Sequence, residues 1–155
     1  MKYNIVVHKP LMVIGKEERL NLADERASQK IERLWQSIYA QKTFDNIPSL
    51  KRPVDIVGLY TNYDSVGNYS LIVGCIVQSL DIIPQGLVGY NIPETTYAVF
   101  TISGSFPQAI SDFWSELWQK KDELEFARAF TYDFELYDQR FQSARSEVDV
   151  YISIL

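Results

Sequence analysis

The sequence predicts an α+β fold in which a β-α-β-β unit occurs twice. This gives one antiparallel sheet, two helices and a central groove on a pseudo-two-fold axis. Runs rich in β-branched and aromatic residues alternate with turn residues, as strands and their connections do. Two other segments carry apolar residues at a helical period. The order of these elements is the same before and after a linking segment, residues 79–93. The 155 residues fit one domain, 1–155, with half-repeats of about 1–80 and 94–155.

The first half begins with a strand and a helix. Residues 4–15 are expected to form the strand, because β-branched residues dominate them, and Pro10 marks a kink or a sheet edge. Residues 23–41 are expected to be helical, since their apolar residues return every three or four positions. This stripe consists of Ala27, Ile31, Leu34, Trp35 and Ile38. Residues 44–53 contain two prolines and are expected to be a loop.

A hairpin completes the first half. The runs 55–61 and 69–77 are both strand-like, and the short segment between them contains Gly67 and Asn68, which favour a turn. Residues 79–93 hold two glycines and two prolines, so we expect them to link the two halves.

The second half follows the same plan. Residues 96–103 are expected to be a strand and residues 107–121 a helix, with Pro107 tolerated in the first turn. The apolar stripe of this helix consists of Ala109, Ile110, Phe113, Trp114, Leu117 and Trp118. Residues 130–138 and 148–154 are expected to be the last two strands.

The two halves also resemble each other at the level of residues. Residues 55–60 align with residues 132–137, which sets Gly58 opposite Glu135 and Tyr60 opposite Tyr137. If a pseudo-two-fold axis relates the halves, these equivalent strands meet at it. We therefore expect a groove lined by both tyrosines, with the carboxylate of Glu135 reaching into space that the glycine leaves free.

Composition and charge narrow the classes of partner. Aromatic residues make up 14% of the chain and suit the walls of a binding site, and the net charge of −5 is compatible with cationic ligands. Without a cluster of Lys and Arg, direct nucleic-acid binding is not expected. The sequence shows neither a signal-peptide pattern nor a membrane-length apolar run, so a soluble, cytoplasmic protein without membrane contact is expected.

Metal, cofactor and nucleophile sites are not expected. His8 is the only histidine and has no second ligand at metal spacing, which leaves neither a zinc site nor a Ser-His-Asp triad. Cys75 lies in an apolar run and is expected to be a small buried hydrophobe. Trp118 is expected to pack in the core, whereas Trp114 fits either the core or the wall of the groove.

The chain resembles the GyrI-like small-molecule-binding family, the effector-binding module that occurs alone or fused to AraC-type and MerR-type DNA-binding domains. The marks of this resemblance are Trp35, residues 55–60, Tyr69, Val73-Gly74, residues 97–100 before Gly104, Trp114, residues 134–137 and residues 148–152. The resemblance implies an aromatic groove that binds many drugs, with a glutamate at its base that meets cationic, lipophilic compounds. The residues that it assigns to ligand binding are Glu135, Tyr137, Tyr60, Tyr69, Phe100 and Trp114. No helix-turn-helix is expected, which indicates the stand-alone form and puts direct transcriptional control in doubt.

Three functions follow from these expectations. The first is binding of amphipathic, aromatic cations, with Glu135 as counter-ion: rings around the carboxylate would raise its pKa when the site is empty, and each would attract a cation by about 0.5–2 kcal/mol. The second is a hydrolase of strained electrophilic compounds, in which Glu135 activates water. The third is an interaction protein that resembles inhibitors of DNA gyrase. Oligomeric state is left open.

Overall fold

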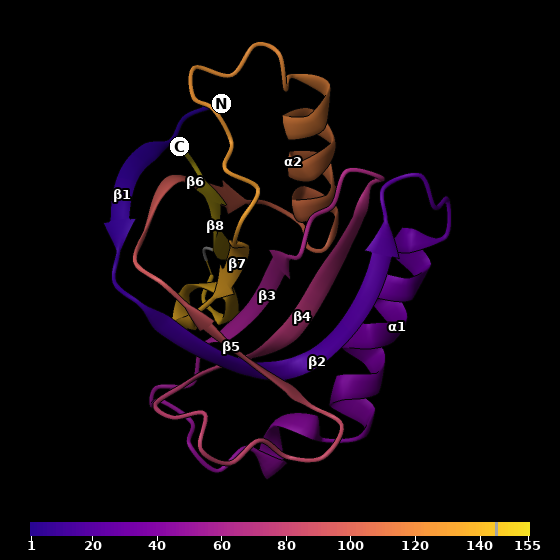
Figure 1. Ribbon diagram of the computed structural model, residues 1–155, viewed down its shortest axis with the longest axis vertical. Coiled ribbons are helices and arrows are strands. Elements are labelled where there is room, and N and C mark those ends of the chain that lie inside the picture. The colour runs from indigo at the N-terminus through magenta and orange to yellow at the C-terminus, as the bar shows by residue number, and fades with distance from the viewer. Residues whose placement is uncertain (145) are drawn as a thin grey trace.

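The computed structural model describes residues 1–144 and 146–155, and it contains one eight-stranded antiparallel sheet and two long helices (Figure 1). The α+β class expected from the sequence is confirmed. The strands follow the order β1-β6-β8-β7-β3-β4-β2-β5 across the sheet. The elements are β1 (Asn4–His8), β2 (Leu11–Asn21), α1 (Ala27–Ala40), β3 (Ile56–Thr61), β4 (Asn68–Val77), β5 (Val88–Ile92), β6 (Thr95–Ser103), α2 (Gln108–Gln119), β7 (Asp133–Tyr137) and β8 (Glu147–Ser153).

Apart from β1, which pairs with β6, the two halves of the chain occupy the two halves of the sheet. The elements β2, α1, β3 and β4 recur in kind and order as β6, α2, β7 and β8. In the sheet, β6, β8 and β7 lie on one side and β3, β4 and β2 on the other, so that β3 and β7 pair at the middle. The pairing of β3 with β7 brings the residues of the candidate site together. The duplication of the β-α-β-β unit remains a prediction.

The expectation of one strand over residues 4–15 is wrong. The chain forms two strands there, β1 and β2, with Pro10 in the connection between them. β1 pairs with β6, whereas β2 pairs with β4 and β5 near the other edge of the sheet. Proline lacks the N–H that a ladder needs, and the break at Pro10 lets the chain pass between the two halves.

The segment 79–93 is more than a linker. Residues 88–92 form β5, which pairs with β2 at the edge of the sheet. Prolines and glycines lie close to this short strand, so composition alone could not distinguish it from a loop.

Both helices pack on one face of the sheet. Leu34 and Ile38 of α1 pack against β2 and β4, and Phe113 and Leu117 of α2 pack against β6 and β8. The opposite face forms its own core because the sheet curls, with β1, β2 and β5 bending around it in Figure 1. No helix in the described ranges is long and apolar enough to cross a lipid bilayer.

A glycine pair permits the bend in β2. Gly15 and Gly74 lie opposite each other on β2 and β4. A Cβ on Gly74 would lie 2.2 Å from the carbonyl oxygen of Ile14, and one on Gly15 would lie 2.4 Å from that of Val73. Only glycine fits so close an approach of two backbones. On the next residue, Cys75 is fully buried, as expected, and burial raises the pKa of its thiol to about 12.

Candidate functional site

Glu135 is a buried carboxylate at the centre of the sheet. It lies on β7, its side chain faces the two helices, and only 2% of its surface is exposed. Its cross-strand neighbour is Gly58 on β3. A Cβ at position 58 would lie 3.1 Å from Oε1 of Glu135, so the glycine provides the room in which the carboxylate sits.

Three neutral groups donate hydrogen bonds to this carboxylate. The Tyr137 hydroxyl donates to Oε1 at 2.6 Å, and the Tyr60 hydroxyl and Trp114 Nε1 donate to Oε2 at 2.8 and 2.7 Å. The donors come from β7, β3 and α2, so both halves of the chain contribute. None of the ion pairs within residues 1–144 and 146–155 involves Glu135. Hydrogen bonds therefore solvate the charge of Glu135, and none of the described residues supplies an opposite charge.

Burial sets the protonation of the site. Desolvation raises the pKa of Glu135, and the hydrogen bonds from Tyr137, Trp114 and Tyr60 oppose that rise only in part. Burial, followed by the nearby charge of Glu135, raises the pKa values of both tyrosines as well. The phenols therefore remain donors throughout the range in which the carboxylate titrates.

We expect this carboxylate to make folding stability depend on pH. Because the pKa of Glu135 is higher in the folded chain than its ordinary 4.5, the folded state holds the proton more tightly. Its contribution is fully present below about pH 4.5 and is lost as pH rises through the folded-state pKa, at about 1.4 kcal/mol per unit of difference. Urea unfolding at a series of pH values from below 4.5 upward should show this loss of unfolding free energy in the native chain and not in Glu135→Gln. If the unfolding free energies of the two proteins changed in parallel with pH, the prediction would be contradicted.

Aromatic rings cover the carboxylate. Tyr60 packs on Trp114 of α2 with ring centroids 4.8 Å apart, and Tyr137 meets Trp35 of α1 edge-on at 5.3 Å. Tyr69 lies behind Tyr60 at 6.1 Å. The cover is thus made of rings from both helices and the central strands, so the carboxylate lies beneath it and not on the floor of an open groove.

Five of the six residues assigned from the resemblance come together here, and Phe100 does not. Its ring packs 5.1 Å from Phe113 and 5.4 Å from Tyr3, in the core beneath α2, and it is 2% exposed. The reason is its strand. β6 is separated from β7 by β8, so α2 covers Phe100. Trp35, which sequence reasoning left out of the site, takes a place in the wall. The available signal was that Trp35, like Trp114, lies on the apolar stripe of its helix.

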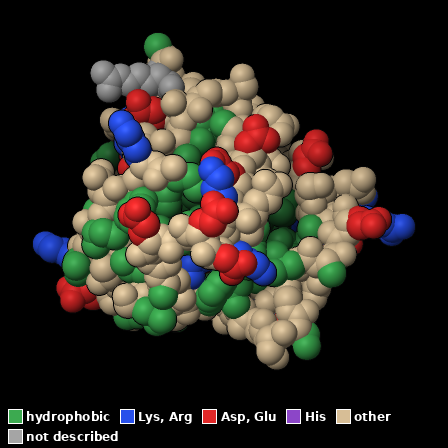
Figure 2. Space-filling view, turned by 90° about the horizontal axis from the view of Figure 1, so that it is seen from above, with side chains coloured by type: hydrophobic (Ala, Val, Ile, Leu, Met, Phe, Trp, Pro, Cys, Tyr) green, Lys and Arg blue, Asp and Glu red, His purple; other side chains and the backbone are tan. Residues whose placement is uncertain are grey.

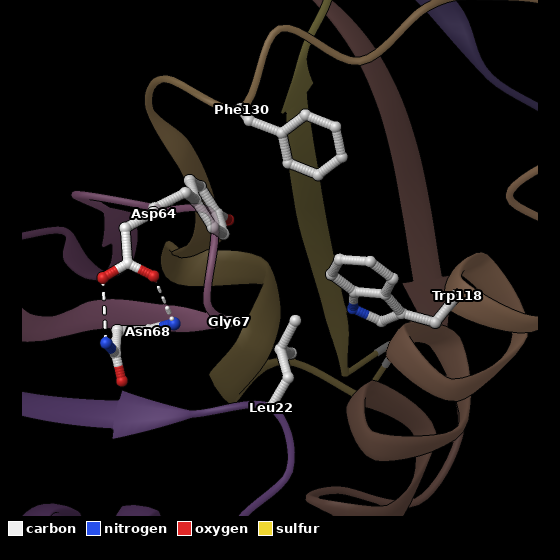
Figure 3. A pocket seen from close by; sticks show the side chains of 7 residues that line it. Leu22, Asp64, Gly67, Asn68, Trp118 and Phe130 are labelled. Carbon is white, nitrogen blue, oxygen red and sulfur yellow. Dashed lines mark hydrogen bonds between the residues drawn. The ribbon is translucent and has the colours of Figure 1, made fainter.

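A hollow lies beside this site at the end of α2. It has a volume of about 310 Å³. Figure 3 shows Leu22, Phe130 and Trp118 converging on it from three separate segments. We call it the Trp118 hollow; its lining consists of Leu22, Tyr63, Asp64, Gly67, Asn68, Trp118 and Phe130. Trp118 was expected to be core, but the residue is partly exposed and lies one position before the end of α2.

Charge on the surface is mixed. Figure 2 shows Lys and Arg side chains interspersed with Asp and Glu on the face seen from above, with hydrophobic side chains between them. Another hollow, of about 320 Å³, lies on α1 between long polar side chains and does not contact Glu135; it is lined by Arg26, Gln29, Lys30 and Arg33. Its walls offer nothing to enclose an apolar ligand, so the aromatic region around Glu135 is the candidate site.

Known proteins and one protein family are similar to this chain. The family model described as "Cass2: Integron-associated effector binding protein" matches residues 4–154. An integron cassette protein from the mobile metagenome of Vibrio cholerae is 29% identical, with a TM-score of 0.77, over 99% of this chain and 95% of that one. The Bacillus subtilis (strain 168) protein named "Putative transcriptional regulator protein YobU" is 31% identical over 140 residues, 87% of this chain and 84% of its own length. The structure of SAV2435 bound to tetraphenylphosphonium has a TM-score of 0.80 and 19% identity, over 100% and 94% of the two chains, and shares the fold.

Proposed function

Because this chain belongs to the family of integron-associated effector-binding proteins, we propose that it binds lipophilic organic cations, with Glu135 as their counter-ion. The observation that carries the proposal is the buried carboxylate, which has three neutral hydrogen-bond donors and no ion-pair partner within the described ranges. A buried charge without an opposite charge is costly. A cationic ligand would supply the missing charge.

The surroundings of Glu135 favour large, soft cations over small hydrated ones. A carboxylate can accept about four hydrogen bonds, and three are already made, so little directional bonding is left for a ligand. A quaternary onium centre needs none. The rings of Tyr60, Trp114 and Tyr137 present faces and edges to it, and cation–π attraction adds about 0.5–2 kcal/mol for each ring used.

Access requires the aromatic cover to move. Glu135 is 2% exposed, whereas the residues that cover it, Tyr60, Tyr137, Trp35 and Trp114, are each partly exposed. We infer that an arriving cation displaces one of these rings, so that apolar parts of the ligand take over its contacts. Such a site selects by charge and apolar bulk more than by shape, which supports broad recognition of aromatic cations.

Tetraphenylphosphonium and tetraphenylborate test the role of charge. They have nearly the same size and shape and opposite charges, so burial of apolar surface is matched between them. The phosphonium, which is bound in the SAV2435 structure of the same fold, is expected to bind at least about tenfold more tightly, a difference of about 1.4 kcal/mol. Isothermal titration, with quenching of tryptophan fluorescence as a second readout, measures both. Equal affinities, or tighter binding of the borate, would refute the proposal.

The hydrolase alternative predicts a different result. An enzyme that uses Glu135 to activate water would lose turnover in Glu135→Gln while keeping most of its affinity for substrate. The binding function predicts the reverse, with loss of cation affinity and no turnover to lose. The same variant therefore separates the two functions when product formation and binding are measured together.

A further inference from the structure

The Trp118 hollow is separate from the groups that contact Glu135 but is joined to them by a continuous row of rings. Tyr63, in its lining, stacks on Tyr69 at 6.3 Å, and Tyr69 packs at 6.1 Å on Tyr60, which donates to the carboxylate. On α2, Trp118 follows Trp114 by four residues. It therefore lies on the same side of the helix and about 6 Å further along its axis.

An internal cation lies against the rings of the hollow. The Arg128 guanidinium carbon is 4.3 Å from the centroid of the Phe130 ring and 5.0 Å from that of Trp118. The Arg128 side chain is 4% exposed and forms an ion pair with Asp133 at 2.8 Å. These rings therefore already have a positive charge against them, which disfavours a second cation in the hollow and favours an uncharged ring.

The one carboxylate in the lining is already engaged. Asp64 accepts hydrogen bonds from the backbone N–H groups of Val66 and Asn68 and from the Asn68 amide, and it forms an ion pair with Arg19. Figure 3 shows the two contacts between Asp64 and Asn68, which hold the turn of the β3–β4 hairpin. The Asp64 carboxylate therefore stabilises the hairpin turn. The aromatic rings of the lining remain as the groups that a ligand in the hollow would contact.

We propose that the Trp118 hollow is a second subsite, which takes an uncharged aryl group of the same ligand whose cationic centre pairs with Glu135. The inference rests on the proposed function. Its volume of about 310 Å³ is at the lower end of the roughly 300–1,000 Å³ of small-molecule pockets, so it accommodates one ring system. The ligand class is then an aryl-alkyl onium compound with one positive charge, in which a spacer at least as long as the rise of about 6 Å from Trp114 to Trp118 separates the charge from the ring.

A series of phenylalkyl-trimethylammonium ions of increasing spacer length tests the subsite. Each is compared with the alkyl-trimethylammonium ion that lacks the ring, which isolates the gain in affinity due to the phenyl group. We expect this gain to be absent for spacers shorter than about 6 Å and to peak at about tenfold at one longer spacer length. We expect it to vanish in Trp118→Leu and Phe130→Leu, which keep apolar bulk and remove the ring. A bis-ammonium ion of the same length should bind less tightly than the phenyl compound.

The controls separate failure of the subsite from failure of the proposed function. Ile82→Ala alters an exposed apolar side chain outside the hollow and should keep the full gain from the ring. Phe130 is 43% exposed, so its replacement should leave the fold intact, which thermal unfolding checks. If Glu135→Gln abolishes binding but the gain survives in both ring variants, the subsite is wrong and the cation site stands. If Glu135→Gln leaves the whole series unchanged, both are wrong.

Discussion

Replacing Glu135 with glutamine is expected to weaken binding of tetraphenylphosphonium about 100-fold, equivalent to about 2.7 kcal/mol. The variant removes the charge that the ligand pairs with and keeps the shape of the side chain. A cation that enters the site would then lose its hydration without gaining an opposite charge. The loss should be much smaller for an uncharged aromatic compound of similar size.

The hydrogen bonds explain why this variant should fold. The amide oxygen can take the position of Oε2 and accept from Trp114 and Tyr60. The amide nitrogen then takes the position of Oε1, where the Tyr137 hydroxyl turns to accept instead of donate. Replacement by leucine would leave all three donors without an acceptor, so it would mix a loss of stability with a loss of binding.

Titration calorimetry on Glu135→Gln and on Glu125→Gln tests this expectation. Glu125 is an exposed carboxylate that also accepts from a tyrosine hydroxyl, that of Tyr3 at 3.2 Å, so it matches the chemistry of the site without its burial. Its variant should bind as the native chain does. A loss of similar size in both variants would show that the net charge of the chain, and not the buried carboxylate, attracts the cation.

The centre of the site could be anticipated from the sequence because of a property of antiparallel strands. When two equivalent antiparallel strands pair around a two-fold axis, a residue pairs with its own counterpart only at the axis. Residues away from the axis pair with other positions. The alignment set Gly58 against Glu135, and the register pairs those same residues. Tyr60 pairs with Asp133, and Tyr137 pairs with Ile56, two positions on either side. Both tyrosines are therefore within reach of one carboxylate.

The rest of the site depends on packing that no local pattern records. Phe100 is an aromatic residue, as the wall of a binding site requires. The arrangement of the whole sheet, however, determines which strands α2 covers, and α2 covers Phe100. The Trp118 hollow joins Tyr63, Trp118 and Phe130 from three segments, and its internal cation, Arg128, comes from a loop without periodicity. Pairings of this kind follow from topology, which the sequence indicated only in outline.

Replacing Arg128 with methionine is expected to lower the free energy of unfolding by about 3–5 kcal/mol. Arg128 is 4% exposed, and its partner Asp133 is fully buried. Besides the ion pair, Asp133 accepts hydrogen bonds from the Ser153 N–H and hydroxyl, at 2.7 and 2.8 Å, and from the Tyr63 hydroxyl at 2.7 Å. Without the guanidinium, a charge would remain in the core with neutral donors alone.

Urea unfolding of Arg128→Met and Lys120→Met measures the contribution of burial. Lys120 forms an ion pair with Glu116 at 2.7 Å, close to the 2.8 Å of the buried pair, but both side chains are nearly half exposed. Its loss should cost less than about 1 kcal/mol. The double variant Arg128→Met/Asp133→Asn should be more stable than the sum of its single variants implies, because it leaves neither charge alone. Similar losses for Lys120→Met and Arg128→Met would contradict the role of the buried pair.

This comparison bears on the binding site as well. Asp133 and Glu135 are two residues apart on β7 and thus share a face of the sheet, and both are buried. The chain supplies a cation to Asp133 and only neutral donors to Glu135. If Arg128→Met destabilises the chain as expected, the fold gains from neutralising a buried carboxylate at this depth. The same gain is then open to an external cation at Glu135, which would stabilise the native chain against urea and leave Glu135→Gln unchanged.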